Sequence, residues 1–214
     1  MMTQLDRLLE ALTADIRQLP TRSTILLFAA CATGLRPAFV AWEAVRRTGN
    51  QGLLDRAISA AYSYMREGQV PGDLKSLLKL MEDATPPGDS PDAVSSTDAQ
   101  DCWISADTAI RLMVDPAFDA APVIYYALEP IVQATTLDLY GVSDVGSGEN
   151  EAAMVARVAE DARVMAAVGF LRWAVERLGA EGAEDDELVD QLQARSIALS
   201  PLSPDRTTPS SASL

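Results

Sequence analysis

The sequence contains no histidine among its 214 residues. This absence excludes serine–histidine and cysteine–histidine nucleophile pairs, and it removes the most versatile metal-binding side chain. It also excludes the helical di-iron motif in which glutamate and histidine bind metal together. Any catalytic site would have to be built from carboxylates. The composition therefore favours a protein without enzymatic activity, and it predicts no cofactor.

Cysteine is almost absent as well, since Cys31 and Cys102 are the only two. Two cysteines in apolar surroundings make neither a disulfide framework nor a zinc site. We expect two buried free thiols, which fits the reducing cytoplasm. The amphipathic N-terminal segment carries acids and does not resemble a signal peptide. The most apolar run, residues 24–35, is too short to span a bilayer and predicts a buried core helix.

Basic residues are scarce: 17 Lys and Arg stand against 31 Asp and Glu, a net charge of −14. Residues 1–100 carry 12 acids and 10 bases, whereas residues 101–214 carry 19 acids and 7 bases. Such a surface repels nucleic acid and anionic membranes, so we expect neither as a partner. It attracts a basic protein partner, or it serves only to keep the protein soluble.

Aromatic residues make up only 6% of the chain, and alanine and leucine recur at helical spacing. No alternating pattern typical of strands has any length. The sequence therefore predicts an all-α, single-domain bundle of about eight helices over residues 1–198, with a buried central helix near 97–114. Residues 199–214 are rich in serine and proline and predict a disordered tail.

Proline and glycine residues set several of the expected helix boundaries. Gly34 and Pro37 predict that one helix ends near residue 35 and another begins at 37. Pro130 predicts a kink within a helix that reaches Tyr140. A single long helix is expected over 149–179, with its buried face formed by Met154, Val158, Ala162, Met165, Gly169, Trp173 and Leu178.

The central helix carries three acids. Asp98 and Asp101 are expected in its first turn, where acids complement the helix dipole. Asp107 lies at the edge of the apolar face, and a buried acid needs a partner. Arg36, Arg111 and Tyr125 or Tyr126 are the candidates for a structural pair. The alternative is a functional contact of Asp107 with a metal, ligand or partner.

Three hypotheses for function follow. The first is an interaction module whose acidic residues, above all Glu184, Asp185, Asp186 and Glu187, bind a basic protein; a solvated helix start is the simpler interpretation of this run. The second is a carboxylate site for a metal, formed by Asp98, Asp101 and Asp107. The third is a small-ligand pocket beside Trp103 and Tyr125, although core packing is the default for this tryptophan.

The order of several segments resembles a bacterial family of helical proteins, the YjaG-like family. The segments are STILLFAACATGL, a helix end at Thr48-Gly49, LLDRAISAAYSYM, LMEDATP and DAQDCWISADTAIRLMV. The resemblance covers roughly residues 20–145 and departs at Thr108, where the family has alanine. It implies a helical fold and no assigned activity. A looser resemblance to helical immunity proteins of bacterial toxin systems implies an inhibitor that binds another protein.

Overall fold

The computed structural model describes residues 4–68, 71–87, 93–141, 151–181 and 185–201. In these ranges the chain forms nine α-helices and two short 3-10 helices (η1 and η2) and no strand, which confirms an all-α single-domain bundle. The predicted disordered tail lies outside the described residues from 202 onward. The helices are α1 (Gln4–Ile16), α2 (Thr21–Arg46), α3 (Gln51–Glu67), α4 (Leu74–Asp83), α5 (Ala93–Val114), η1 (Ala121–Ile124), α6 (Tyr125–Tyr140), α7 (Glu151–Ala159), α8 (Ala162–Glu181), α9 (Asp186–Arg195) and η2 (Ser196–Leu199).

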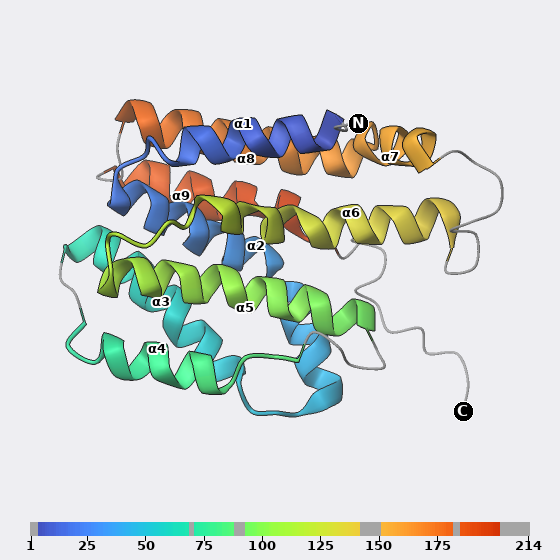
Figure 1. Ribbon diagram of the computed structural model, residues 1–214. Coiled ribbons are helices and arrows are strands. Elements are labelled where there is room, and N and C mark those ends of the chain that lie inside the picture. The colour runs from blue at the N-terminus through green and yellow to red at the C-terminus, as the bar shows by residue number, and fades with distance from the viewer. Residues whose placement is uncertain (1–3, 69–70, 88–92, 142–150, 182–184, 202–214) are drawn as a thin grey trace.

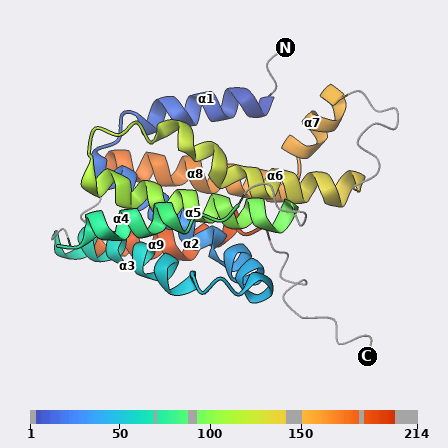
Figure 2. The ribbon, with the colours of Figure 1, turned by 60° about the horizontal axis from the view of Figure 1, so that its bottom comes forward.

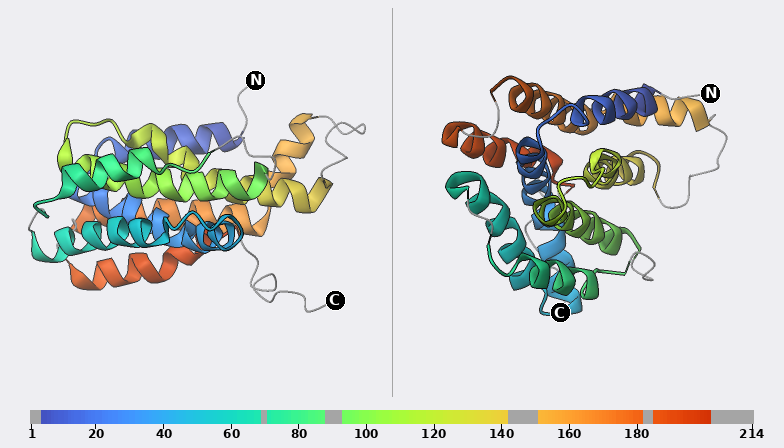
Figure 3. Two further views of the ribbon diagram at one scale, coloured as in Figure 1. Left: turned by 90° about the horizontal axis from the view of Figure 1, so that it is seen from below. Right: turned by 60° about the vertical axis from the view of Figure 1, so that its left-hand side comes forward.

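Helix α2 lies in the middle of the bundle and is surrounded by the other helices (Figure 1). Viewed from the end, α1 and α8 lie above it, α3 and α9 to one side, and α5 and α6 to the other (Figure 3). The side chains of α2 from Ile25 to Ala32 are all buried, so this helix is apolar around its whole circumference. That pattern explains its central position.

The most extensive contact in the bundle is between α2 and α5. Both helices carry small buried side chains, including Ala29 and Ala32 on α2 and Ala99 and Ala106 on α5. The Cys102 thiol donates to the backbone carbonyl of Ala32 across 3.4 Å. Small residues let the two backbones approach closely enough for that bond. Both cysteines are buried and free, as predicted.

The prediction that the chain breaks near Pro37 is wrong, because α2 continues through the proline to Arg46. A proline inside a helix costs about 3 kcal/mol. Leu35, Phe39 and Trp42 are 0–3% exposed. Burying such side chains stabilises by about 1.5–3 kcal/mol each, which outweighs the cost. The helix bends in its second half, as its light-blue end shows in Figure 1.

The full length of α2 also bears on membrane insertion. At 26 residues α2 is long and apolar enough to cross a bilayer by length and composition, although the 24–35 run alone is not. However, 72% of its apolar window is buried inside the bundle. That burial favours the core helix of a water-soluble protein.

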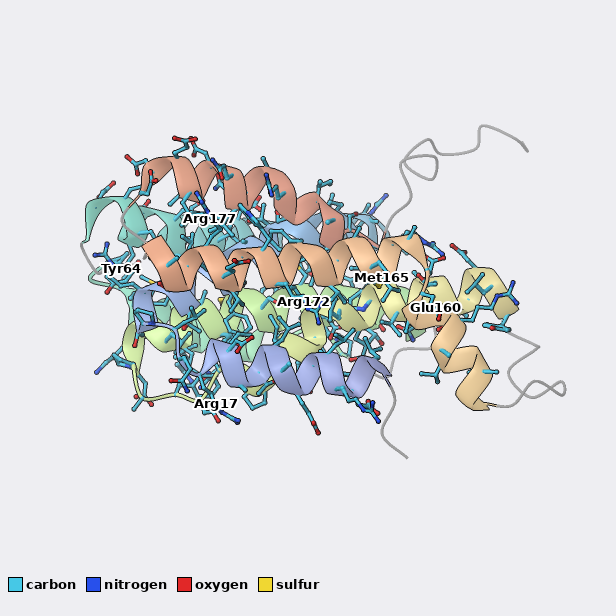
Figure 4. The ribbon with its side chains drawn as sticks, turned by 90° about the horizontal axis from the view of Figure 1, so that it is seen from above. Arg17, Tyr64, Glu160, Met165, Arg172 and Arg177 are labelled. Atoms are coloured by element: carbon cyan, nitrogen blue, oxygen red, sulfur yellow. The ribbon has the colours of Figure 1, made fainter. Side chains whose placement is uncertain are left out.

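The predicted long helix over 149–179 is divided at Glu160 and Asp161. The Asp161 carboxylate accepts a hydrogen bond of 2.9 Å from the backbone N–H of Arg163, which caps the start of α8. The break rotates the buried face of α8 away from the predicted one. Met165 is 46% exposed and Gly169 is exposed, while Val164, Val168 and Leu171 are buried. Of the predicted face, Val158 and Leu178 are buried as expected. Figure 4 shows Met165 and Arg172 on the outer side of α8.

Candidate functional site

Asp98 and Asp101 are in the core and not in an exposed first turn. Helix α5 begins at Ala93, so both acids lie beyond its first turn. Their spacing of three residues places them on one face. Asp98 is 7% exposed and Asp101 is 1% exposed. The expectation that they are dipole-complementing acids at a helix start is therefore wrong.

Each of these two carboxyl groups has an oxygen without a partner. Among the described residues, Asp98 Oδ1 and Asp101 Oδ2 are buried and make no hydrogen bond. The nearby Ser105 hydroxyl donates to the Asp101 backbone carbonyl at 2.9 Å and so does not satisfy the carboxyl group. Buried polar groups almost always have partners, and each exception needs an explanation.

Helix α6 adds a third carboxylate, Glu129, and a hydroxyl, Tyr125. The two residues are one turn apart on the same helix, and the tyrosine hydroxyl lowers the pKa of the glutamate. Glu129 is half-buried and Tyr125 is 47% exposed, so the cluster reaches solvent through α6. We call Asp98, Asp101, Glu129 and Tyr125 the carboxylate cluster.

The electrostatics of the carboxylate cluster favour protonated acids. Burial, followed by the charge of Glu129, raises the pKa of Asp98 to about 7. Burial, then Glu129 and then Asp98, raises the pKa of Asp101 to about 8. Burial also raises the pKa of Glu129, against the opposing effect of the Tyr125 hydrogen bond. In the described part of the chain, no arginine or lysine offsets these effects on Asp98 or Asp101.

The partner of Asp107 is Arg111, one of the predicted candidates. The guanidinium group approaches the Asp107 carboxylate at 3.1 Å and the Glu82 carboxylate at 2.9 Å. Burial raises the pKa of Asp107 more than Arg111 lowers it. Arg36 is not the partner, because it forms two hydrogen bonds of 2.6 and 2.9 Å with Asp55.

Asp107 does not share a site with the other two acids of α5. It lies nine residues after Asp98, which is about 13 Å along the axis and on the opposite side of the helix. In the described ranges, no three Asp, Glu or Cys residues are grouped so as to hold a metal ion. The structure thus separates the predicted metal set of Asp98, Asp101 and Asp107 into a pair and a single ion-paired residue.

Trp103 is a core residue. It is 1% exposed, stacks on Phe39 with ring centroids 5.6 Å apart, and donates from Nε1 to the Met81 carbonyl at 3.0 Å. These contacts join α5 to α2 and α4. The predicted ligand pocket beside Trp103 and Tyr125 is therefore not formed by Trp103, which does not line the groove that contains Tyr125.

The acidic run before α9 is a helix start. Asp185 accepts a hydrogen bond of 2.9 Å from the backbone N–H of Glu187, and Asp186 and Glu187 occupy the first turn, all three exposed. Glu184 lies outside the described residues. For Asp185, Asp186 and Glu187, the interpretation of this run as a solvated helix start is confirmed.

Sequence reasoning missed Glu129. It interrupts the apolar segment VIYYALEPIV, the same signal that singled out Asp107 in the central helix. The sequence could not show that Glu129 acts on Asp98 and Asp101, because this effect depends on how α6 packs against α5.

Comparisons with known proteins inform the fold and give no information on the candidate site. No family model and no curated protein matches the chain. The crystal structure of a DUF416 family protein from Shewanella baltica OS155 matches with a TM-score of 0.68 and 17% sequence identity. The match covers 86% of this chain and 92% of that one. The two proteins share a fold. At this identity the likeness connects the chain neither to the YjaG-like family nor to immunity proteins.

Proposed function

We propose that the protein binds a small organic cation, with a positively charged nitrogen held by the buried carboxyl groups of Asp98 and Asp101 and attracted by the charge of Glu129. The observation that carries this proposal is the pair of buried carboxyl groups with unpartnered oxygens, one of them on a residue only 1% exposed. Burying such groups without partners costs several kcal/mol. A ligand that provides the missing donors explains why the fold retains them.

An ammonium group fits the carboxylate cluster better than a metal ion does. Calcium takes six to eight oxygen ligands at 2.3–2.6 Å, and no group of three suitable ligands occurs in the described residues. An ammonium group carries one positive charge and three N–H donors that can reach separate acceptors. Its charge would also relieve the repulsion of Glu129 toward Asp98 and Asp101.

The test uses n-propylammonium as the probe and 1-propanol as its uncharged control, by calorimetric titration at pH 8.5. We expect the ammonium ion to bind and the alcohol to bind at least tenfold more weakly. Asp101→Asn should weaken ammonium binding at least tenfold, because it removes one acceptor charge. Asp107→Asn is the matched control on the same helix and should leave the affinity unchanged. Equal affinity for amine and alcohol, or for the wild type and Asp101→Asn, would refute the proposal.

We infer a second candidate function, an immunity-like or inhibitor role, from the exposed acids of α9. Asp185, Asp186, Glu187 and Asp190 are all exposed, and Asp190 pairs with Arg66 at 2.8 Å. These acids could bind a basic protein partner in the cytoplasm, the compartment that two buried free thiols favour. Rim charges of this kind act mainly on association rate and salt dependence.

A pair of charge-neutralised variants tests this second function. Retention of the protein on immobilised cytochrome c, used as a basic probe, should fall between 50 and 300 mM NaCl. Asp186→Asn with Glu187→Gln should weaken retention more than the matched change Glu10→Gln with Asp15→Asn on α1. Equal losses from both pairs would show only the effect of net charge and would contradict a docking surface on α9.

A further inference from the structure

A groove of about 230 Å³ adjoins the carboxylate cluster. It lies where α1, α6 and α7 meet, with α1 and α7 on the same side of α6 (Figure 2). Most of its wall is apolar and comes from Leu5, Leu9, Leu128, Val132 and Val155. We call this feature the α1–α6–α7 groove.

Two residues belong to both the groove and the carboxylate cluster. Tyr125 and Glu129 line the α1–α6–α7 groove, and Glu129 is the charge that acts on Asp98 and Asp101. Among the described residues, the groove wall contains one further carboxylate, Asp6, and no arginine or lysine. The wall is thus mainly apolar with two carboxylates, and one of them, Glu129, acts electrostatically on the two buried carboxyl groups of α5.

We propose that the α1–α6–α7 groove holds the apolar part of the cation, so that the ligand is an alkyl- or arylalkylammonium ion of about six to eight carbons. This inference rests on the proposed function and adds the class of ligand. The ammonium group would lie at Glu129 and Asp101. The hydrocarbon would lie along Leu9, Leu128 and Val132.

Volume and charge both favour this occupant. The groove holds about eight times the ~30 Å³ that a water molecule occupies in the liquid, and it is smaller than the ~300–1,000 Å³ of drug-sized pockets. It therefore suits a ligand of roughly eight non-hydrogen atoms. The described part of the wall has Asp6 and Glu129 and no base, so it repels a fatty acid of the same size and attracts an amine.

The experiment compares the affinities of n-propyl-, n-butyl-, n-pentyl- and n-hexylammonium by calorimetry at pH 8.5. Each added methylene should tighten binding about fourfold, the equivalent of ~0.8 kcal/mol per buried CH₂. Leu9→Ser should flatten this dependence on chain length while propylammonium still binds. Leu8→Ser is the matched control, because Leu8 is also partly buried on α1 but does not line the groove.

Three outcomes would overturn the inference, and they differ from a failure of the proposed function. If the affinity did not change with chain length while propylammonium still bound, the cation site would stand, but the groove would be excluded as the binding place of the hydrocarbon. If Leu9→Ser and Leu8→Ser changed the chain-length dependence of the affinity equally, the effect would come from altered folding and not from the groove. A wild-type dimer that Leu9→Ser dissociates, detected by sedimentation, would show that a second copy covers the groove. If no amine binds at all, the proposed function itself fails.

Discussion

At the scale of single residues, the unusual feature is the retention of two acids in an alanine-rich core. Asp98 and Asp101 are almost fully buried, and Glu129 adds a charge that opposes their ionisation. A carboxyl group whose pKa is raised by folding destabilises the folded state wherever the unfolded chain would be ionised. Residues that reduce stability in this way are typical of binding sites.

Replacing Asp101 with asparagine should stabilise the protein at alkaline pH. The pKa of Asp101 is about 8 in the folded protein and near its ordinary value of ~3.9 in the unfolded chain. Between these values the folded state holds a proton that the unfolded state lacks, so the stability of the wild type falls as the pH rises. The asparagine side chain cannot ionise, so the variant would not show this loss.

We expect Asp101→Asn to raise the free energy of unfolding at pH 8.5, with the gain shrinking toward pH 4. Urea denaturation at several pH values measures it. A gain that does not vary with pH would be inconsistent with the raised pKa of Asp101.

Asp107→Ala should cost about 1 kcal/mol at pH 7. Asp107 and Arg111 have side chains 20% and 32% exposed, and such partly exposed i,i+4 pairs contribute little. Arg111 would keep its contact of 2.9 Å with Glu82. A double-mutant cycle with Arg111→Ala should return a coupling energy of about 0.5 kcal/mol. A loss above about 3 kcal/mol would mean that Asp107 holds a group other than Arg111.

At the scale of helices, the sequence predicted most elements and erred where tertiary packing overrides local preference. The helices near residues 4–16, 51–67 and 74–83 follow directly from apolar periodicity and their flanking glycine and proline residues. Pro37 did not end α2, because the apolar residues after it find a core to bury in. Asp161 ended a helix that periodicity alone continued, because its side chain caps α8.

The candidate site shows the same limit. The acids of α5 were visible in the sequence, and Arg111 was one of the candidate partners predicted for Asp107, beside Arg36 and Tyr125 or Tyr126. The burial of Asp98 and Asp101 was not predictable, because helix α5 starts about four residues earlier than expected and α6 then covers it. Contacts between distant helices depend on packing, which the periodicity of one helix does not encode.

Gly34 offers a sharp test of how closely α2 packs against η2. A Cβ atom added at Gly34 would lie 2.1 Å from the carbonyl oxygen of Ser196, which is backbone and cannot rotate away. Gly34→Ala should therefore cost about 3 kcal/mol. Gly169→Ala on α8 is the control, since nothing lies within 4 Å of its added Cβ. It should gain about 0.5–1 kcal/mol from helix propensity.

Circular dichroism during urea unfolding measures both glycine variants. A tolerated Gly34→Ala, with a loss below about 0.5 kcal/mol, would contradict the close packing of α2 on η2.

At the scale of the whole molecule, the net charge of −14 lies mostly in residues 101–214, and exposed ion pairs such as Arg17–Asp119 and Arg66–Asp190 are individually weak. Like charges on a compact surface repel, and salt screens them. Raising NaCl from 20 to 300 mM should raise the melting temperature by about 2–4 °C, because relief of repulsion exceeds the loss of pairs such as Arg17–Asp119. A falling melting temperature would mean that the exposed ion pairs dominate.

The most direct test of cation binding at Asp98 and Asp101 is whether binding releases protons from their carboxyl groups. At pH 7.5 an alkylammonium ion remains charged, whereas Asp98 and Asp101, with pKa values of about 7 and 8, hold about one proton between them. Calorimetry with n-propylammonium in phosphate and in HEPES, neither of which is a primary ammonium ion, separates the heat of binding from the heat of proton uptake by the buffer. We expect the release of about 0.5–1 proton for each ligand bound, and a much smaller release from Asp101→Asn. Identical binding heats in the two buffers would contradict it.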